Sequence, residues 1–504
     1  MKLSEVFSDI NSDIKIKGIT IDSRRVSSGY LYVCIEGLRV DGHSFAIDAI
    51  KNGATALVCR KGFSLPDEYK DIVLIYSDNP RLDLSLACSK FYNSPTQGMT
   101  TIGITGTNGK SSVVHFISQA LERLTGDKVG TIGTLGAGIN GSSVNIPYAT
   151  STTPDTVELY EILSHMREEG VKYLVMEVTS HALALEKVSH ILFQYGIFTN
   201  LTQDHLDFHG TFENYRLAKA RLFDLCEKGI INIDDNSAEF LKDYAKCGML
   251  GYSINNPSEY QAYNASFDSD GIKYEIDNQI LNIPITGKFN IYNTLCTYAI
   301  LSDMGFGQKD IKNALEKAIG IPGRIQRVNA PSDITVIVDY AHTPDGLENI
   351  ISSCREFAKG RIITVFGAGG DRDKGKRPLM GTIVGKLSDI CIITSDNPRN
   401  EEPMSIINDI IEGIHSQYTA IVDRKEAIEF AIQQAQKDDI IIIAGKGHEN
   451  YQEFENGRRE HFSDMEVAEH YFSKINIECP NSRRIYETTK YKRNSHSRKR
   501  YIKQ

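Results

Sequence analysis

The sequence lacks the features that mark membrane, secreted and zinc-knuckle proteins. No apolar run approaches the roughly 20 residues that a membrane-spanning helix needs, and the strongest one, Ile440 to Ala444, has the length of a strand. Residues 1–10 contain no basic region followed by an apolar stretch, so no secretory signal is readable there. The nine cysteines are scattered singly without a Cys-x-x-Cys pair, which argues against a disulfide framework. Together these absences predict a cytoplasmic protein with no membrane span.

Acidic residues outnumber basic ones over residues 1–482 taken together, whereas the C-terminal end is basic. The chain has a formal net charge of −9, but residues 483–504 hold nine Lys and Arg against the single acid Glu487. The remainder therefore carries −17, from 47 basic and 64 acidic residues. An acidic body argues against nucleic acid as the main partner. We expect the basic tail, residues 479–504, to be flexible and solvated; binding to an acidic surface, an anionic lipid or RNA is the alternative.

The composition is that of a globular protein with several domains. Hydrophobic residues make up 41% of the chain and charged residues 24%, and roughly 100–200 residues per domain allow about three or four domains. We divide the chain into a smaller N-terminal block up to residue 95, a central block of residues 96–327 and a C-terminal block of residues 328–478. Short β-rich runs and helical stretches mix in the first block, for example at Ile16–Ile21 and Phe45–Asn52.

Strands and helices alternate in the other two blocks. The central block opens with a predicted strand over residues 100–104 and a predicted helix over 110–124. In the C-terminal block, predicted strands cover residues 335–339, 361–366, 389–394 and 439–444, and predicted helices cover 343–357 and 404–415. This alternation predicts an α/β protein with parallel sheets covered by helices, the last of them doubly wound and Rossmann-like. Ligands collect at the carboxyl ends of the strands in such sheets.

A glycine-rich turn between the first strand and helix of the central block is typical of a phosphate-binding loop. Residues 105–112 are Thr-Gly-Thr-Asn-Gly-Lys-Ser-Ser. Glycines let the backbone wrap closely around phosphate, and amide groups at the start of a helix present partial positive charge. We expect Lys110 to contact the β- and γ-phosphates and the Ser111 hydroxyl to contact magnesium. The spacing is shorter than the usual GxxxxGK[ST] pattern, which leaves an ordinary glycine-rich turn as the alternative.

Further segments, in order along the chain, resemble the motifs of the Mur ligases, which use ATP to add amino acids to a UDP-linked sugar peptide. They include an acidic motif, a histidine motif and a segment that carries a modified lysine in that family. The segments lie at residues 176–181, 200–207, 214–219, 290–293, 322–324, 339–345 and 369–378. The resemblance extends over about residues 15–470, and it is to the diaminopimelate-adding branch of the family.

The resemblance implies three domains with separate tasks. Residues 1–95 would bind the UDP-sugar peptide, residues 96–327 ATP on a parallel sheet like that of P-loop ATPases, and residues 328–478 the amino acid. It also implies an ATP- and Mg²⁺-dependent, amide-forming ligase of peptidoglycan precursor synthesis. The terminal carboxylate of UDP-N-acetylmuramoyl-L-Ala-D-Glu would attack the γ-phosphorus of ATP, and the amine of meso-diaminopimelate would displace phosphate from the acyl phosphate. Because two anions meet, positive charge and metal matter more than a base.

The resemblance also assigns catalytic roles. Lys110, Glu177, His205 and Lys219 are expected to carry the chemistry, and Ser111, Glu177, His205 and Lys219 to hold magnesium. Lys219 would first lose its proton and react with carbon dioxide, giving the carbamate N6-carboxylysine. From the residues alone, His205 would be a buried structural histidine and Lys219 a solvated helix residue.

ATP is expected to contact the phosphate loop and several later positions. These are Gly106, Thr107, Asn108, Gly109, Lys110, Ser111, Ser112, Asn290, Asn293, Arg324, Asp339 and His342. Asn290 and Asn293 would also suit the cap of a helix, and the two interpretations are compatible.

The UDP-peptide is expected to contact positions in the first two blocks, namely Ile21, Ser23, Ser151, Thr152, Thr153, Thr179 and Lys187. Three positions depart from the family pattern. Ser151 stands where Asn is frequent, Lys187 where an arginine usually contacts substrate, and Leu185 at a position that is polar in some relatives. Lysine keeps the charge of arginine but lacks its planar fork, so we expect a weaker contact at Lys187.

The amino acid is expected to be meso-diaminopimelate, which ends in a second amino-acid head where lysine ends in one ammonium. Such a head needs a cation, ideally a bidentate arginine, and an acid. Residues 396–399, Asp-Asn-Pro-Arg, resemble the signature of diaminopimelate-adding enzymes, in which Arg399 would grip the distal carboxylate and Glu449 the distal ammonium. The expected contacts are Arg372, Asp396, Asn397, Pro398, Arg399, Gly445 and Glu449. The alternative for Arg399 is a solvated loop residue.

Two other functions remain open at this point. The same fold could add L-lysine or another amino acid, or it could be a non-ligating nucleotide-binding regulatory protein. Arg372 and Arg399 argue against the first. The second is opposed by the presence together of Lys110, Ser111, Glu177, His205 and Lys219. Folylpolyglutamate synthases share the phosphate loop, but no UDP-type first domain is expected in them. We expect a monomer.

Overall fold

The computed structural model describes residues 1–10, 12–37, 40–146, 152–202, 204–268, 271–321, 323–330, 333–478 and 501–502. Ser151 and almost all of the basic tail therefore lie outside the described residues. The chain forms two compact units. The first comprises Met1–Ala265, Lys273–Ile283 and Phe289–Ala318, and the second Ser266–Ile272, Pro284–Lys288 and Ile319–Gln504. Within the described ranges, no helix is long and apolar enough to cross a membrane.

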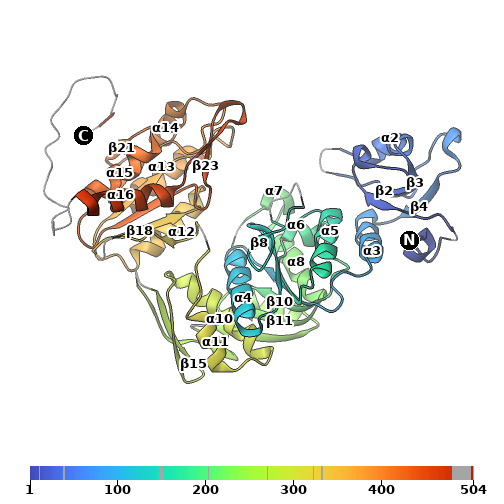
Figure 1. Ribbon diagram of the computed structural model, residues 1–504, viewed down its shortest axis with the longest axis horizontal. Helices are drawn as coiled ribbons and strands as arrows, with labels where there is room; N and C mark the ends of the chain where they lie inside the picture. The colour runs from blue at the N-terminus through green and yellow to red at the C-terminus, as the bar shows by residue number, and fades with distance from the viewer. Residues whose placement is uncertain are drawn as a thin grey trace. The chain divides into compact units, whose positions relative to one another are not determined.

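The N-terminal part of the first unit is a small parallel sheet (Figure 1). Its strands pair in chain order as β1 (Gly18–Thr20), β2 (Tyr30–Val33), β3 (Ala54–Arg60) and β4 (Val73–Ser77). The apolar side chains of β2 and β3 are fully buried, Leu31 and Leu57 among them. Helix α2 (Ala46–Lys51) packs on β3, and α3 (Pro80–Phe91) begins with a proline in its first turn. Because proline cannot donate to the preceding turn, this position suits it.

The rest of the first unit is built on a nine-stranded sheet. Its order is β13-β12-β11-β10-β5-β9-β6-β7-β8, and the strands from β13 to β6 are parallel. The bounds are β5 (Thr100–Thr105), β6 (Val129–Gly133), β7 (Gly136–Ile139), β8 (Ser142–Ser143), β9 (Tyr173–Glu177), β10 (Phe193–Phe198), β11 (Cys226–Asn232), β12 (Gly248–Ser253) and β13 (Tyr260–Gln261). At its end, β7 pairs antiparallel with β6, and β8 pairs antiparallel with β7.

Helices cover the central sheet and carry the expected motifs. They are α4 (Lys110–Thr125), α5 (Thr156–Glu168), α6 (Ser180–Ala184), α7 (Leu206–His209), α8 (Phe212–Ala220), α9 (Ala238–Tyr244), α10 (Lys288–Asp303) and α11 (Gln308–Leu315). A small sheet of β14 (Tyr263–Phe267), β15 (Ile272–Ile276) and β16 (Gln279–Ile283) was not expected. Its strands are short and mix polar with apolar residues, so they give a weak periodic signal.

The second unit holds a seven-stranded sheet in the order β17-β18-β22-β19-β20-β21-β25. The five central strands, β18 (Thr335–Asp339), β22 (Ile440–Ala444), β19 (Ile362–Phe366), β20 (Ile390–Ile393) and β21 (Tyr418–Ala420), are parallel. β17 (Gln326–Arg327) and β25 (Tyr501–Ile502) flank them antiparallel. A separate hairpin joins β23 (Tyr451–Glu453) and β24 (Arg459–His461).

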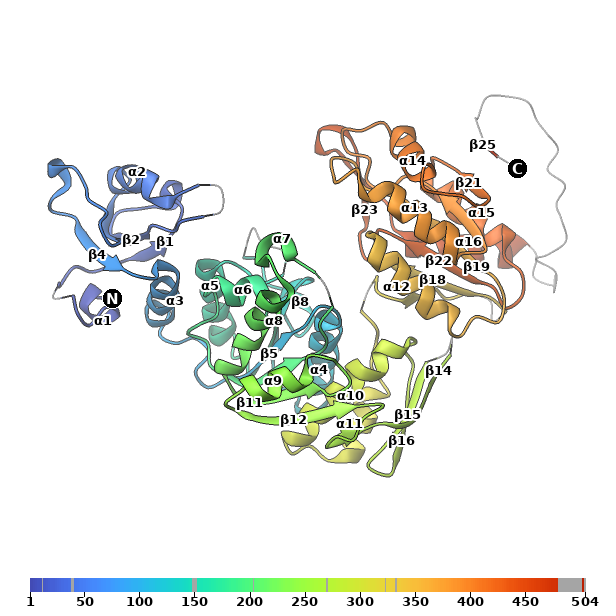
Figure 2. The same ribbon diagram turned by 180° about the vertical axis from the view of Figure 1, so that it is seen from behind.

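Helices cover both faces of this sheet, as a doubly wound fold requires. One face packs on α12 (Pro344–Arg355), α13 (Lys376–Leu387) and α14 (Pro403–Ile411) and the other on α15 (Arg424–Gln434) and α16 (Asp464–Glu478). Helices α13 and α14 lie side by side in both views (Figures 1 and 2). The strands buried between these layers read as continuous apolar runs, such as Ile440–Ala444, because both of their faces are covered. The predicted α/β class and doubly wound C-terminal sheet are confirmed.

Candidate active site

The phosphate loop follows β5 and ends where α4 begins. Gly106 and Gly109 have φ angles of +146° and +86°, which L side chains rarely adopt. The Lys110 ammonium folds back over the loop and donates to the carbonyls of Gly106 and Thr107, both at 2.9 Å. Helix α4 thus begins at the loop, which places the amide groups of its first turn beside it.

Glu177 joins the loop to the neighbouring strand of the sheet. It ends β9 and is 2% exposed, and its Oε1 accepts from the Ser111 hydroxyl and from the Thr134 amide, both at 2.8 Å. Strands β5 and β9 are parallel neighbours, which brings the two motifs to the same carboxyl edge. A hydroxyl and a carboxylate in contact are oxygen ligands of the kind that Mg²⁺ prefers, so this pair fits the expected metal.

Lys219 is buried beneath the same loop. Its side chain lies on α8 and is 2% exposed, and Nζ donates to the Gly106 carbonyl at 2.7 Å. The Tyr215 ring packs over it, with Nζ 4.6 Å from the ring centroid. Burial holds the pKa of Lys219 well below its usual range, and the nearby Lys110 charge lowers it further. The interpretation of Lys219 as a solvated helix residue is therefore wrong.

His205 stands at the rim of this region. It has a left-handed φ of +52° just before α7, and its side chain is 48% exposed, with Nε2 3.4 Å from Asp204 Oδ2. The alternative of a buried structural histidine is therefore wrong. Its ring lies edge-on to that of His181 at 4.9 Å. In the part of the chain that the structure describes, no three His, Cys, Asp or Glu side chains converge as metal ligands.

Asn290 and Asn293 lie beside the phosphate loop and inside α10. Both are 4% exposed, and the Asn293 amide donates to Asn290 Oδ1 at 3.1 Å. They do not cap the helix, because α10 begins at Lys288. A Cβ on Gly109 would lie 2.6 Å from Asn293 Oδ1, so any residue larger than glycine at this position would clash with α10.

Replacing Gly109 with alanine is expected to weaken ATP binding roughly tenfold or more, because the new Cβ strains φ and also displaces Asn293. Gly126 offers a matched control at the other end of α4. It has a similar φ of +73°, but a Cβ there would meet nothing within 4 Å. Titration calorimetry with ATP should separate the two variants. Equal affinities for Gly109→Ala and Gly126→Ala would contradict a nucleotide role for the Asn293 contact.

The expected UDP-peptide residues fall in two places within the first unit. Thr153 and Thr179 lie at Glu177, where the Thr153 hydroxyl donates to the Glu177 carbonyl at 3.0 Å and accepts from the Thr179 amide at 3.2 Å. Thr152 shares a hydroxyl contact of 3.3 Å with Thr134. Ile21 and Ser23 lie just after β1 in the N-terminal domain, where Ser23 is buried and Ile21 is exposed.

Lys187 is buried in an ion pair. Its Nζ is 2.5 Å from Asp155 Oδ1, and the residue is 9% exposed. The Lys187 charge thus already has a partner on the chain, consistent with a weaker substrate contact. Leu185 ends α6 nearby in the sequence, and Ser151 lies outside the described residues.

The residues of the second unit that are expected to contact ATP lie around the end of β18. The Asp339 carboxylate accepts the amides of Ile325 and Ala341, both at 2.8 Å, and burial raises its pKa. His342 Nδ1 lies 2.8 Å from the Tyr340 carbonyl. The guanidinium of Arg324 lies 5.9 Å from the centroid of the Tyr340 ring, which places the three expected residues around one loop.

Gly323 holds the segment that carries Arg324 against the end of β22. It has a φ of +72°, and a Cβ there would lie 2.0 Å from the His448 amide nitrogen. The segment therefore packs backbone to backbone on the loop of residues 445–449. This contact ties the expected nucleotide residues to one of the loops expected to bind the amino acid.

The expected diaminopimelate residues lie at the carboxyl ends of neighbouring parallel strands, β19, β20 and β22. Arg399 has a left-handed φ of +51°, and its guanidinium donates to Glu453 Oε2 at 3.0 Å and to the Gly370 carbonyl at 2.8 Å. A Cβ on Gly369 would lie 3.0 Å from Arg399 Nη1 and 3.7 Å from Arg372 Cγ, so the two arginines flank this glycine. Arg399 is thus a held side chain and not a solvated loop residue.

Asp396, Asn397 and Glu449 lie in the loops after β20 and β22, at the same edge of the sheet. The Asn397 side-chain amide donates to Glu449 Oε2 at 2.9 Å. Asp396 Oδ2 is buried with no hydrogen-bond partner, 2.6 Å from where a Cβ on Gly445 would lie. Pro398 connects Asn397 to Arg399 in the same loop.

Several partners of these residues were not predicted from the sequence. Thr134 and Tyr215 hold Glu177 and cover Lys219, and Lys446 and Glu453 contact Asn397 and Arg399. Lys446 was visible between two glycines after a strand, a placement that brings a side chain to the carboxyl edge. Glu453 follows in a short hairpin that no periodic pattern marked.

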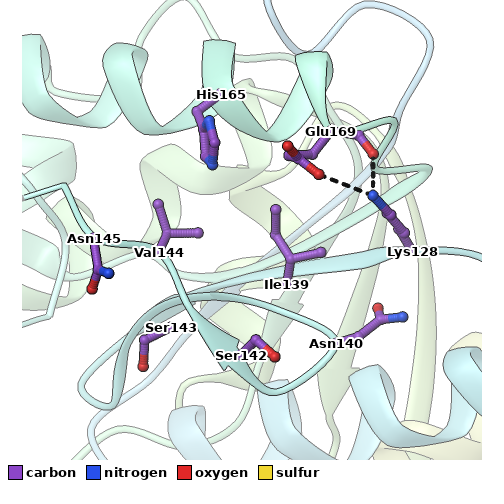
Figure 3. Close-up of a pocket in the computed structure, with 9 residues that line it drawn as sticks. All are labelled: Lys128, Ile139, Asn140, Ser142, Ser143, Val144, Asn145, His165 and Glu169. Atoms are coloured by element: carbon purple, nitrogen blue, oxygen red, sulfur yellow. Dashed lines mark hydrogen bonds and ion pairs between the residues drawn. The ribbon is translucent and has the colours of Figure 1, made fainter.

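A hollow elsewhere in the first unit contains none of the expected residues. It has a volume of about 480 Å³ and is lined by Lys128, Ile139, Asn140, Ser142, Ser143, Val144, Asn145, His165 and Glu169. Figure 3 shows the Lys128 ammonium bonded to the carbonyl and carboxylate of Glu169. These two charges neutralise each other, so the hollow offers no unpaired charge for a ligand.

Comparison with known proteins gives three family matches along the chain. Residues 15–84 match the Mur ligase family, catalytic domain, residues 104–301 the Mur ligase middle domain, and residues 323–447 the Mur ligase, glutamate ligase domain. A UDP-N-acetylmuramoyl-L-alanyl-D-glutamate--2,6-diaminopimelate ligase of Clostridium tetani is 42% identical over 489 residues, which cover 94% of this chain and 100% of the relative. The ligase of the same name from Clostridium perfringens is 43% identical over 469 residues, 91% and 95% of the two chains.

Solved structures agree. One of a UDP-N-acetylmuramoyl-L-alanyl-D-glutamate--2,6-diaminopimelate ligase has a TM-score of 0.69 and 30% identity, and the match covers 94% of this chain and 99% of that one. A Mycobacterium tuberculosis folylpolyglutamate synthase has a TM-score of 0.57 at 17% identity over 72% of this chain and 92% of its own, which shows the fold alone. The family predicted from the ordered motifs is confirmed, with its three-domain α/β fold. The chain belongs to the Mur ligase family.

Proposed function

We propose that this protein is an ATP-dependent ligase that joins meso-diaminopimelate to UDP-N-acetylmuramoyl-L-Ala-D-Glu in peptidoglycan precursor synthesis. The observation that carries the proposal is the constellation at the phosphate loop, where Lys110, the Ser111–Glu177 pair and buried Lys219 meet. Relatives that are 42% and 43% identical over nearly the whole chain bear the name of this activity. A regulatory protein that only bound nucleotide would not need a buried lysine with a lowered pKa at the loop.

In the first step the D-Glu carboxylate of the acceptor attacks the γ-phosphorus of ATP. ADP is the leaving group, and the acceptor becomes an acyl phosphate. Lys110 and the amides of the first turn of α4 stabilise the negative charge that spreads over the γ-phosphoryl oxygens. In the second step the amine of diaminopimelate attacks the acyl carbon, an amide forms, and phosphate leaves. The nitrogen loses its proton to solvent or phosphate in this step.

Magnesium fits this site as a carrier of positive charge between the phosphates. The Ser111 hydroxyl and the Glu177 carboxylate would hold it, with His205 and Lys219 as further ligands. When bound, the metal neutralises the phosphate oxygens and lowers the repulsion between the two anions. Ser111 and Glu177 share one hydrogen bond without metal, which keeps their oxygens together.

Lys219 serves this site as a carbamate. Burial favours its neutral amine, which is the form that reacts with carbon dioxide. The N–C bond forms at Nζ, and one proton leaves the nitrogen. The product, N6-carboxylysine, replaces the neutral amine beside Lys110 with an anion that can hold metal.

The remaining expected residues bind the three substrates. Asn290 and Asn293 lie at the adenine, and Arg324, Asp339 and His342 at the ribose and phosphates. Thr152, Thr153, Thr179 and Lys187 contact the acceptor peptide, and Ile21 and Ser23 the UDP group. Arg399 and Arg372 grip the distal carboxylate of diaminopimelate, and Glu449 its distal ammonium. The enzyme works as a cytoplasmic monomer, in three domains with boundaries near residues 95 and 327.

The test is ATP-dependent phosphate release with UDP-N-acetylmuramoyl-L-Ala-D-Glu, comparing meso-diaminopimelate with L-lysine. Release with diaminopimelate alone supports the proposal. Release with L-lysine instead would keep the ligase and discard the role of Arg399. Steady ATP turnover that does not depend on the acceptor would point to a simple ATPase.

Deleting residues 483–504 is expected to leave kcat and the KM values within about twofold, because no predicted contact with substrate lies there. The truncated chain loses a local charge of +8 and the two-residue edge strand β25, which pairs with β21. Binding to anionic vesicles and to RNA should be measured with both chains. A large loss of activity on truncation would make the tail part of the catalytic fold.

A further inference from the structure

A fully buried lysine lies in the amino-acid pocket of the second unit. Lys446 is 0% exposed and follows β22 between Gly445 and Gly447. Its ammonium donates to Asn397 Oδ1 and to Glu449 Oε2, both at 3.0 Å. A buried charge is costly unless it is paired and hydrogen-bonded. Such a group is therefore tied to the geometry of its partners.

Lys446 fixes the orientation of the Asn397 side chain. Asn397 Oδ1 accepts from the Lys446 ammonium and from the Glu453 amide at 2.9 Å, while its Nδ2 donates to Glu449 Oε2 at 2.9 Å. Turning the amide over would point its NH₂ group at two donors and its oxygen at a carboxylate. The three side chains of Lys446, Asn397 and Glu449 thus form a closed ring of hydrogen bonds.

The ring also fixes Glu449. The Asn397 amide and the Lys446 ammonium both donate to Oε2 of the Glu449 carboxylate. Its side chain is 17% exposed, so the carboxylate is held from one side and can accept a ligand on Oε1. Without the Lys446 ammonium, the carboxylate would be partly buried and uncompensated.

The pocket is electrically balanced in this arrangement. Lys446 pairs with Glu449, and Arg399 pairs with Glu453 at 3.0 Å. Arg399 and Glu449, the cation and the acid expected at the distal carboxylate and the distal ammonium, therefore each already have a partner of opposite charge. A zwitterionic head brings one charge of each sign and keeps this balance, whereas a lone ammonium adds a positive charge with no matching anion.

We propose that Lys446 is a positioning and specificity-determining residue: by holding Asn397 and Glu449 it makes the pocket prefer a zwitterionic side-chain end over a lone ammonium. This inference rests on the proposed ligase function and deepens its amino-acid specificity. Lys446 acts through Glu449 and Asn397 and does not itself contact the substrate.

The test compares Lys446→Met with wild type, using steady-state rates with meso-diaminopimelate and with L-lysine. Methionine keeps most of the apolar volume and removes the charge, leaving Glu449 to attract a lone cation. We expect the ratio of kcat/KM for diaminopimelate to that for L-lysine to fall by roughly tenfold to a hundredfold. KM for diaminopimelate should rise while KM for ATP stays unchanged, a split that a general loss of structure would not give.

Two further variants keep the test decisive. Lys437→Met changes an exposed lysine of the same domain and should behave as wild type. Lys446→Met combined with Glu449→Gln removes both charges, so it should fold even if the single variant does not, and it should use L-lysine less well than the single variant. Equal use of L-lysine by the single and double variants, or an unchanged ratio in Lys446→Met, would overturn the role of Lys446.

The same measurements distinguish a wrong ligase function from a wrong role of Lys446. If wild type releases no phosphate with diaminopimelate, the proposed function is wrong. If wild type is active and selective but Lys446→Met keeps the same selectivity, only the assignment of Lys446 is wrong.

Discussion

Replacing Lys219 with alanine is expected to lower ligase turnover roughly a hundredfold to a thousandfold, the effect of removing a preorganised charge from a buried site. The substitution removes the amine that would form the carbamate, and with it the hydrogen bond of 2.7 Å to the Gly106 carbonyl. Steady-state phosphate release measures the loss, and thermal unfolding shows whether the fold survives. A rate within a fewfold of wild type would remove the carbamate from the mechanism.

Short carboxylates separate the carbamate from other roles of Lys219. Acetate or formate would fill the space left in Lys219→Ala and supply an anion, so part of the activity should return. Lys219→Arg keeps a positive charge that cannot react with carbon dioxide, and it should stay inactive with or without added carboxylate. Lys242→Ala, which changes an exposed lysine of the same unit, is the matched control.

The pH dependence of wild-type activity should reflect the same group. Burial, with the Lys110 charge beside it, lowers the pKa of Lys219, so its amine stays neutral to a lower pH than a free lysine. As pH falls through that lowered pKa, the amine takes up a proton and can no longer carry the carbamate. We expect activity to be lost on the acid side and to depend on dissolved carbon dioxide there.

Much of the fold was predictable because many of its strands are long enough to show a clear apolar pattern in the sequence. The predicted strands over residues 335–339 and 439–444 match β18 and β22 closely, since both are buried on two faces and therefore uniformly apolar. The helix predicted over residues 110–124 is α4, with one glycine at each cap. The short strands β14 to β16 were not predicted, because each is half exposed and mixes residue types.

The candidate site was predictable as a set of motifs but not as contacts. Glu177 and Ser111 stand far apart in the sequence, and the pairing of β5 with β9 brings them together. The residue-level alternatives for Lys219 and His205 failed for the same reason. Periodicity along a short helix or loop reports its local exposure poorly, and burial is set by which elements pack over it.

The contacts of the residues expected to bind the amino acid could not be predicted from the sequence. Arg399 and Glu449 were expected to hold charges ready for a ligand, whereas in the structure each is paired, with Glu453 and Lys446 respectively. Glu453 lies on β23, whose hairpin folds back toward the loop of Arg399. Such a pairing depends on tertiary contacts between segments that are more than 50 residues apart.

Replacing Arg399 with alanine is expected to raise KM for diaminopimelate by roughly tenfold to a hundredfold, because a charge-assisted bond to a carboxylate is lost and that carboxylate stays buried. KM for ATP should change little, since Arg399 lies in the loop after β20 and is not among the residues expected to contact ATP. Steady-state rates with each substrate varied in turn measure both. Equal rises in the two KM values would rule out a specific grip on the distal carboxylate.

The partner of Arg399 makes this prediction sharper. Once the Arg399 guanidinium is gone, Glu453 loses its ion pair at 3.0 Å and keeps the more distant Arg459 guanidinium at 4.0 Å, so the negative charge around Glu453 is less well compensated. Arg399→Ala should therefore use L-lysine better relative to diaminopimelate, whereas Arg399→Ala with Glu453→Gln should lose diaminopimelate affinity without that gain. Arg355→Ala, which breaks a surface ion pair on α12, should change neither preference. The two ion pairs, Arg399–Glu453 and Lys446–Glu449, thus predict that both cations are needed to exclude a substrate with a lone ammonium.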